Sequence, residues 1–331
     1  MRWWMVRLKE SQEYSFLREL NSQSLVSRLR ELDNTYWDCF LKRKEGAQLP
    51  VIKKRSKHNS FHLPDPKKQA QVKGNKVKLS KIGEVTFFKS RKIDGEIRTA
   101  RVFYRTGYWY ISFQVKQEID IPKRKDKGRA GIYLGGKNLL TLVTNKNKKE
   151  RYDLLNIYGK YEPLLKKKQK SLKRKVSFSK NWEKKQAEIK KIHRKIFNTR
   201  RDTLHKISTE VCKNHATIYL SDFRVLKTLN KGRLKKKEKE KNKKVLDQGL
   251  WYLKEFIVYK GLWRGNIVKK VNNENSILTC SSCGVINDTR QGEKFCCNDC
   301  GLKESLEINA AKNILAAGHA VTVCEANQLR N

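Results

Sequence analysis

Two C-x-x-C pairs near the carboxyl end of the chain constrain its fold more than any other sequence feature. Cys280 and Cys283 form the first pair, Cys297 and Cys300 form the second, and thirteen residues separate the pairs. Each pair directs two thiolates towards one point, and two pairs complete the tetrahedral four-sulfur set typical of structural zinc. We therefore predict a zinc ribbon over residues 276–303. Four thiolates leave no open position, so the zinc is expected to be structural rather than catalytic.

Cys296 lies next to Cys297 and is an alternative fourth ligand. Its use would change the spacing to C-x-x-x-C, so we favour Cys297. The remaining cysteines are expected to be ordinary buried thiols: Cys39, Cys212 and Cys324. Because the cysteines have metal spacing rather than the pattern of a disulfide framework, we predict a reducing, cytoplasmic location.

The charge balance predicts a polyanionic partner. The chain has 76 lysine and arginine residues against 33 aspartate and glutamate residues, a formal net charge of +43 at pH 7. A compact protein with this charge repels itself unless a polyanion is nearby, and nucleic-acid phosphates provide one. No signal peptide is expected, since residues 1–9 are short and interrupted by charge. No apolar run approaches the roughly 20 residues of a transmembrane helix, so no membrane partner is expected.

The N-terminal third of the chain divides into a helical and a β-rich part. Apolar residues recur at helical spacing over residues 11–44, and a basic loop with prolines follows. From 75 to 118 the period shifts towards two, with glycines at the turns. This pattern predicts an antiparallel barrel or sheet.

The rest of the chain alternates strands and helices. A strand, a glycine turn and a second strand are predicted from residue 129, and a strand over 217–223 and another over 266–271 follow. The lysine-rich tract 234–244 is low in complexity and is expected to be mobile. Helices are predicted over a basic hairpin at 159–206, over 246–265, and over the segment EINAAKNILAAG, with Gly318 as its C-terminal cap.

The order of these motifs resembles the TnpB family of transposon-associated, RNA-guided nucleases. The matching segments are GIYLGGKNLLTL, the strand ending in SDF, the ribbon, and EINAAKNIL. The resemblance implies a multidomain α+β fold with an N-terminal helical recognition region and a wedge-like β-barrel segment. These are followed by an RNase H-like (RuvC) α/β domain with an inserted helical hairpin and zinc ribbon. The implied boundaries are a recognition region with a wedge remnant at 1–70, the β-rich wedge at 71–125, the RuvC-like domain at 126–275 with its hairpin at 159–206, the ribbon at 276–303, and the last RuvC-like segment at 304–331.

The same resemblance assigns three catalytic positions, and all three depart from the family pattern. The family motifs supply Asp, Glu and Asp, which hold two Mg²⁺ ions for hydrolysis. Here the matching residues are Tyr133, Ser221 and Glu307. A phenol with a pKa of about 10 is neutral at pH 7, serine carries no charge, and glutamate is one methylene longer than aspartate. We therefore expect no catalytic Mg²⁺, a loss of nuclease activity, and a protein that is not an enzyme.

The implied function is RNA-guided DNA binding that represses transcription by occupying the target. The expected partners are a guide RNA encoded near the protein's own gene and double-stranded DNA with a short flanking motif, in the nucleoid of a prokaryotic cytoplasm. One alternative is an RNA-guided DNA endonuclease with an atypical RuvC site. A second is a basic zinc-ribbon protein that binds nucleic acid without a guide.

Two groups of residues are candidates for nucleic-acid contact. Reading of the flanking motif is assigned to the N-terminal helices and the loop after them, although Trp37 is equally well interpreted as a core residue. Phosphate contact is assigned to a basic stretch of the helical hairpin that matches a family pattern. The candidates are Tyr36, Trp37, Lys53 and Lys54 for the flanking motif, and Arg200, Arg201, His205 and Lys206 for phosphates.

Overall fold

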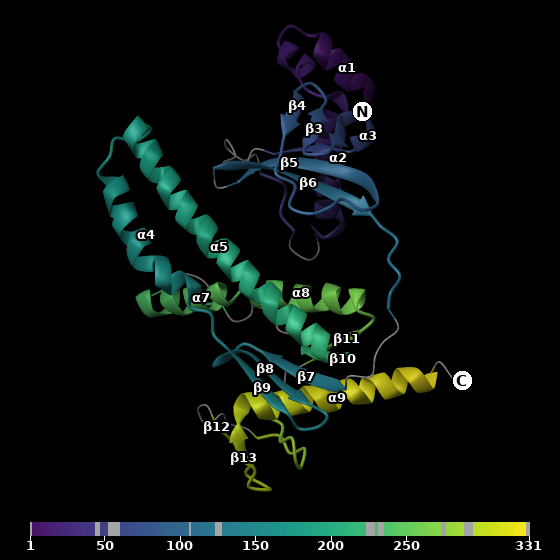
Figure 1. Ribbon diagram of the computed structural model, residues 1–331, viewed down its shortest axis with the longest axis vertical. Coiled ribbons are helices and arrows are strands. Elements are labelled where there is room, and N and C mark those ends of the chain that lie inside the picture. The colour runs from purple at the N-terminus through teal and green to yellow at the C-terminus, as the bar shows by residue number, and fades with distance from the viewer. Residues whose placement is uncertain are drawn as a thin grey trace. The chain divides into compact units, whose positions relative to one another are not determined.

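A computed structural model of the chain divides into two compact units, Met1–Ile119 and Asp120–Asn331. Each unit is described by itself (Figure 1). The structure describes residues 2–43, 47–51, 60–105, 107–122, 128–222, 229–230, 235–272, 276–287 and 294–328.

The described part of the first unit contains three helices before its first strand and a short one after it. They are α1 (Arg2–Glu10), the 3-10 helix η1 (Ser15–Arg18), α2 (Ser22–Leu41) and the short α3 (Pro66–Gln69). The single helix predicted over 11–44 is therefore interrupted. Asn21 causes the new start, because its side chain accepts hydrogen bonds from the backbone amides of Gln23 and Ser24 and so caps α2.

Two antiparallel sheets complete the first unit. One has the order β1-β5-β6 and the other β2-β3-β4. The strands are β1 (Ser60–Leu63), β2 (Ala70–Lys73), β3 (Lys76–Leu79), β4 (Gly83–Thr86), β5 (Glu96–Arg105) and β6 (Tyr108–Lys116). The predicted antiparallel pairing is confirmed, but the described strands form two three-stranded sheets, and the first strand begins earlier than predicted. Their shared core is small: Leu63, Ala70, Val77, Leu79, Ala100 and Val102.

A mixed five-stranded sheet forms the centre of the second unit. Its strands are β7 (Arg129–Leu134), β8 (Asn138–Thr144), β9 (Lys149–Asp153), β10 (Thr217–Ser221) and β11 (Ile267–Val271). The order is β11-β10-β7-β8-β9, with β10 parallel to β7 and β11, and β8 antiparallel to β7 and β9. The predicted strands from 129, at 217–223 and at 266–271 are confirmed.

Helices cover both faces of this sheet (Figure 1). One face packs on α5 (Lys180–Asn214) and α8 (Leu250–Trp263), and the other packs on α9 (Leu306–Gln328). Side chains alternate between the faces, as the period of a strand requires. Ile218 and Leu220 of β10 join the α5–α8 core, whereas Tyr219 between them joins the α9 core.

Three helix boundaries in this unit differ from the predictions. The tract expected to be mobile is helical over its described part, α7 (Lys236–Gln248). The helix predicted over 246–265 is divided by Gly249, whose φ of +62° ends α7 and precedes α8. Gly318 does not end α9, which continues to Gln328. Instead Gly318 lies against the ring of Tyr219, and a Cβ atom there would collide with that ring.

The predicted basic hairpin is confirmed, with wider bounds. It consists of α4 (Ile157–Lys173) and the long helix α5. The two helices pack through Leu165 of α4 and Ile189 and Ile196 of α5. The cysteine ribbon follows β11 and contains the short strands β12 (Lys294–Cys296) and β13 (Lys303–Ser305).

Candidate metal centre and nucleic-acid interface

The four predicted zinc ligands lie together. The Sγ atoms of Cys280 and Cys300 are 3.6 Å apart, and those of Cys283 and Cys297 are 3.5 Å apart. All four sulfurs lie within 4.8 Å of one another. A tetrahedral zinc ion with Zn–S bonds of about 2.3 Å places its sulfurs about 3.8 Å apart. The four thiols therefore fit a metal such as zinc.

Cys297 rather than Cys296 belongs to this group, as predicted. Cys296 is the last residue of β12 and is not among the clustered thiols. The backbone amides of Cys300 and Asp299 lower the pKa of the Cys297 thiol, whereas burial and hydrogen bonds with the other three thiols raise the pKa of Cys283. The lowered pKa favours the thiolate, which is the form that binds metal. Of the three other cysteines, Cys39 and Cys212 are buried as predicted, and the side chain of Cys324 lies outside the described residues.

Two asparagines attach the ribbon to α9. The Asn309 side chain accepts a hydrogen bond from the amide of Ser281 (2.8 Å) and donates one to the carbonyl of Thr279 (2.7 Å). Asn313, one turn later, donates to the carbonyls of Ser276 (2.8 Å) and Thr279 (2.7 Å). The knuckle of the first C-x-x-C pair is thereby fixed to the helix that carries Glu307.

The three positions that the resemblance assigns to catalysis come together on the α9 face of the sheet. Ser221 ends β10, and its Oγ atom accepts a hydrogen bond from the amide of Leu134, the residue after Tyr133 (3.2 Å). Tyr133 pairs across the sheet with Thr141, and the Thr141 hydroxyl donates to Glu307 Oε2 (3.0 Å). Directly paired residues share a face, so Tyr133, Ser221 and Glu307 border one buried region.

Both carboxylate oxygens of Glu307 accept hydrogen bonds within the protein. Its Oε1 atom accepts hydrogen bonds from the backbone amides of Lys137 and Asn138 (3.1 Å for Asn138). Its Oε2 atom accepts from Asn138 Nδ2 (2.5 Å) and from the Thr141 hydroxyl. Gly136 has a φ of +97°, and a Cβ atom at this position would collide with Oε1 of Glu307. Glu307 thus joins the start of α9 to the turn between β7 and β8.

Asp222, the acid next to Ser221, is directed elsewhere. Its carboxylate forms an ion pair with Lys254 Nζ of α8 (2.5 Å), and the Lys254 side chain is 10% exposed. α8 covers the face of the sheet opposite to α9. Asp222 therefore does not join Tyr133 and Glu307.

The resemblance places Mg²⁺ at carboxylates in these three positions, and Glu307 is the one carboxylate among the three side chains. Mg²⁺ demands near-octahedral oxygen ligands at about 2.1 Å and gives up its water reluctantly. Tyr133 and Ser221 carry no carboxylate, and both oxygens of Glu307 already accept hydrogen bonds. No step of a mechanism is therefore assigned to magnesium at this position.

Arg200, a predicted phosphate contact, forms an ion pair within the protein. Its guanidinium forms an ion pair with Asp247 of α7, whose side chain is 7% exposed. A second Asp247 oxygen accepts from the backbone amide of Tyr158 (3.0 Å), at the start of α4. Arg200 consequently ties together α5, α7 and α4.

The other three residues of that stretch lie near one another on α5. Arg201 is exposed, and its Nε atom donates to His205 Nε2 (3.4 Å). The His205 ring stacks on Phe256 of α8, with ring centroids 3.9 Å apart. Lys206 is exposed and pairs with Asp202 (2.7 Å). Arg201 and Lys206 thus present charge at the surface, and their contact with phosphates stays a prediction.

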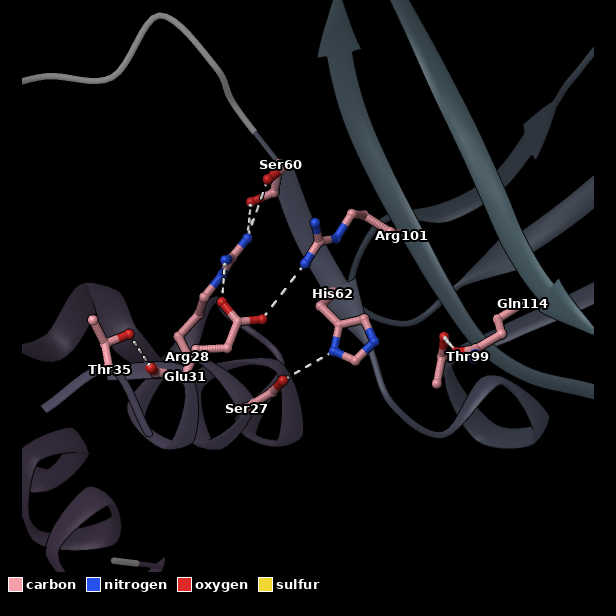
Figure 2. Close-up of polar contacts among 9 residues, drawn as sticks. All are labelled: Ser27, Arg28, Glu31, Thr35, Ser60, His62, Thr99, Arg101 and Gln114. Atoms are coloured by element: carbon pink, nitrogen blue, oxygen red, sulfur yellow. Dashed lines mark hydrogen bonds and ion pairs between the residues drawn. The ribbon is translucent and has the colours of Figure 1, made fainter. Parts of the chain in front are cut away.

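In the first unit, the structure places the candidates for motif reading only in part. Tyr36 and Trp37 lie on α2 and are 39% and 61% exposed, so Trp37 is not a core residue. Lys53 and Lys54 lie outside the described residues. The sequence interpretation also missed a network beside α2 (Figure 2), because it joins α2 to Ser60, His62 and Arg101, which are distant from that helix in sequence. In this network Glu31 pairs with Arg28 (2.6 Å) and Arg101 (3.5 Å).

Two family models match the chain. Residues 112–244 match the model described as "Probable transposase", and residues 251–314 match "Cas12f1-like, TNB domain". These matches cover the mixed sheet, the basic hairpin and the cysteine ribbon, and they define a class of transposon-associated proteins.

Within this class, the chain belongs to the TnpB family. It is 34% identical over 331 residues to "Putative RNA-guided DNA endonuclease InsQ" of Escherichia coli (strain K12), a match that covers 97% of this chain and 80% of the relative. It is 27% identical to "Putative RNA-guided DNA endonuclease" of Streptomyces pristinaespiralis, covering 96% and 76%. It is also 26% identical to "TnpB-like protein L79" of Acanthamoeba polyphaga mimivirus, covering 63% and 41%. The predicted family is thereby confirmed.

Solved structures similar to the chain include one described as "Cryo-EM structure of the Cas12f1-sgRNA-target DNA complex". The match covers 89% of this chain and 78% of that chain, with 17% sequence identity and a TM-score of 0.43. Another, "Cryo-EM structure of CRISPR-Cas12f Ternary Complex", matches 67% of this chain and 46% of that chain, with 18% identity and a TM-score of 0.42.

The prediction that the protein is not an enzyme is wrong. The relatives from Escherichia coli and Streptomyces pristinaespiralis are named RNA-guided DNA endonucleases, and endonucleases are enzymes. The prediction rested on three residues, Tyr133, Ser221 and Glu307, that differ from the family's catalytic motifs. It inferred from these three positions that the whole protein is not an enzyme. As for membranes, none of the described helices is both long and apolar enough to cross one.

Proposed function

We propose that this protein binds double-stranded DNA at sites selected by a guide RNA. The main support for this proposal is that the chain is 34% identical, over 97% of its length, to a relative named as a putative RNA-guided DNA endonuclease. A net charge of +43 supports the proposal, since both partners are polyanions. In such a complex, base pairing between guide and target reads the sequence, and the protein holds the backbones and reads a short flanking motif.

In the proposal, two surfaces bind the two nucleic acids. The α4–α5 hairpin, with Arg201 and Lys206 near its base, would hold phosphates of the guide RNA. The N-terminal helices, where Tyr36 and Trp37 are exposed, would meet the DNA beside the target. The four-cysteine ribbon would hold structural zinc and keep α9 in place.

The first experiment identifies the bound RNA. The chain is expressed with the DNA that flanks its gene, purified, and its RNA sequenced. We expect one discrete RNA with a defined end, which would then direct the complex to matched DNA and not to a duplex with a scrambled target. A mixture of unrelated RNA fragments, or equal binding to both duplexes, would contradict the proposal and favour an unguided nucleic-acid-binding protein.

Occupancy of a promoter would repress transcription, because a bound complex excludes the polymerase. This effect is tested with a fluorescent reporter whose promoter carries the matched target. Reporter output should fall when the guide matches and stay constant when the guide is scrambled. Equal reporter output with both guides would reject repression. It would not bear on guided binding, which the first experiment tests.

A second candidate function, guided DNA cleavage, is favoured by the names of the two bacterial relatives. Purified complex is incubated with a matched supercoiled plasmid and Mg²⁺ or Mn²⁺. Nicked or linear plasmid that depends on the matching guide would establish cleavage. Plasmid that stays supercoiled while the complex is bound would reject it under those conditions, and the mismatched guide is the control.

A further inference from the structure

The turn between α4 and α5 exposes two large apolar side chains. Phe178 is 81% exposed and Val176 is 79% exposed. Burial of such side chains is favourable, and a single exposed one needs no explanation. Here, however, the exposed ring lies at the end of a hairpin that is otherwise strongly basic, and its backbone is unusual.

Phe178 has a φ of +67°, in the left-handed region that is rare for a bulky residue. Glycine and asparagine adopt this conformation at a lower cost. The following residue, Ser179, caps α5 by accepting a hydrogen bond from the Trp182 amide (3.2 Å). The Phe178 and Trp182 rings lie 5.3 Å apart. The start of α5 therefore fixes the position of the Phe178 ring instead of leaving it loose.

The chain on both sides of Phe178 is strongly basic. Residues 166–185 include ten lysine or arginine residues and one acidic residue, Glu183. Glu188, three residues after this segment, forms ion pairs with Lys168 (2.6 Å) and Lys185 (2.8 Å). Seven exposed basic residues form no ion pair with any part of the chain that the structure describes: Lys167, Lys170, Lys173, Arg174, Lys175, Lys180 and Lys184.

The hairpin carries this turn away from the sheet (Figure 1). Leu204 of α5 is fully buried in the sheet core, and the helix begins at Lys180. At 1.5 Å per residue, the turn lies about 36 Å along the helix from that contact. Exposed basic residues continue along α5, including Lys191 and Lys195. A single polyanion following the hairpin would therefore reach Phe178 at its end.

An exposed aromatic ring amid lysines fits an unpaired nucleotide. Lysines hold the phosphates, and the ring stacks on the face of a base, which a paired and stacked duplex does not offer. A folded guide RNA keeps unpaired loop bases before any DNA is bound, whereas target-strand bases are paired with the guide. The charge and the fixed ring therefore favour the guide RNA as the occupant.

We propose that Phe178 stacks on an unpaired base of the guide RNA while the basic residues around it bind the adjacent phosphates. This inference rests on the proposed function, since it requires a bound guide. It adds a specific recognition point, the α4–α5 turn, to the general basic surface of the hairpin.

The test compares variants of the turn in binding the RNA that co-purifies with the wild-type chain. Phe178→Ala should weaken RNA binding about tenfold, because stacking on one base contributes at that scale. Phe178→Trp should keep binding within about twofold, since a larger ring stacks at least as well. Val176→Ala, which removes the neighbouring exposed apolar side chain, is the matched control and should bind as wild type does. Far-UV circular dichroism and melting temperatures establish that all variants fold.

A photo-crosslinking amino acid at position 178 locates the contact. Crosslinks should map to an unpaired loop of the co-purifying RNA. Unchanged RNA affinity in Phe178→Ala, equal losses in Phe178→Ala and Val176→Ala, or crosslinks to the displaced DNA strand instead of the RNA would each overturn the inference while leaving guided binding intact. A wild-type chain that carries no discrete RNA would overturn the proposed function itself.

Discussion

Glu307 binds both amide groups of Asn138, the backbone amide at 3.1 Å and the side-chain Nδ2 at 2.5 Å. Asn138 is the first residue of β8, whereas Glu307 is the second residue of α9. The buried carboxylate therefore connects β8, an early strand of the second unit, to α9, its last helix. The Thr141 hydroxyl donates another hydrogen bond to this carboxylate.

Glu307→Gln should destabilise the second unit. The amide would place an NH₂ group against donors that now meet a carboxylate, and hydrogen bonds to charged groups contribute about 1.5–3 kcal/mol each. We expect the free energy of unfolding in urea to fall by about 2–4 kcal/mol. Glu240→Gln, at an exposed position of α7, is the control and should change it by less than about 0.5 kcal/mol. Equal stability of Glu307→Gln and wild type would show that this carboxylate does not connect β8 and α9.

Gly318→Ala distinguishes two roles of this glycine. Alanine is the better helix former by about 1 kcal/mol, so the variant would be stabilised if only the helix mattered. Because Gly318 lies against the Tyr219 ring, we expect destabilisation by about 1–3 kcal/mol from overpacking. Thermal unfolding gives the sign directly. The control Ala317→Gly, at an exposed position one residue earlier, should destabilise by only about 1 kcal/mol.

Gly318 also shows where sequence reasoning succeeds and where it stops. A glycine after an apolar helical face predicts a C-terminal cap, and nothing local distinguishes this from a glycine required by a neighbouring ring. The ring belongs to Tyr219, almost one hundred residues earlier, and only the folded sheet brings the two together. The same limit applies to the ion pair of Arg200 with Asp247 of another helix, which the sequence could not predict; contact of Arg200 with phosphates stays a prediction.

Local patterns did predict the parts of the fold that local physics determines. The spacing of Cys280, Cys283, Cys297 and Cys300 was sufficient to choose the four clustered thiols. The strands β7, β8 and β10 followed from apolar runs bounded by turns. By contrast, the exposed Phe178 could have been suspected from the segment SFS between two basic helices, where an apolar residue in a turn has no core to join.

The ribbon should bind one zinc ion per chain through Cys297 and not Cys296. Cys297→Ser removes one of the four clustered thiols, and zinc content measured by mass spectrometry should fall sharply. Cys296→Ser alters the neighbouring thiol and should leave zinc content unchanged. The opposite pattern would place Cys296 in the metal site, and no zinc in the wild-type chain would reject the site altogether.

His62 should make the first unit less stable in mild acid. Partial burial lowers the pKa of His62, and the positive charge of Arg101 lowers it further (Figure 2). The unfolded chain, with a histidine pKa of about 6.5, then binds more protons than the folded chain at the same pH. The free energy of unfolding should therefore be fully retained above about pH 6.5 and should fall as the pH decreases below it.

The measurement is urea unfolding of the full chain between about pH 5 and 8. His62→Gln should remove part of the decline towards low pH, because glutamine does not titrate. His193→Gln, on the exposed side of α5, controls for the loss of an imidazole. An identical decline in His62→Gln and wild type would show that protonation of His62 does not oppose folding.

Arg200 and Lys206 should separate stability from nucleic-acid binding within one helix. Breaking a buried ion pair by removing one partner costs about 3–5 kcal/mol, and the Asp247 partner of Arg200 is buried. We therefore expect Arg200→Gln to lower the free energy of unfolding by about 3 kcal/mol. Lys206→Gln, whose ion pair with Asp202 is exposed, should leave stability nearly unchanged.

In RNA binding the order reverses. Loss of one phosphate contact at Lys206 should weaken binding and reduce the slope of log affinity against log salt by about 1. Filter binding between about 50 and 200 mM salt measures this slope, and Lys213→Gln on the same helix tests whether any lysine of α5 has the same effect. A salt slope unchanged by Lys206→Gln would remove Lys206 from the phosphate contacts. The opposite result would be an Arg200→Gln variant that is as stable as wild type but whose salt slope for RNA binding is reduced by the same amount. It would return Arg200 to the nucleic-acid interface and show that its ion pair with Asp247 contributes little to stability.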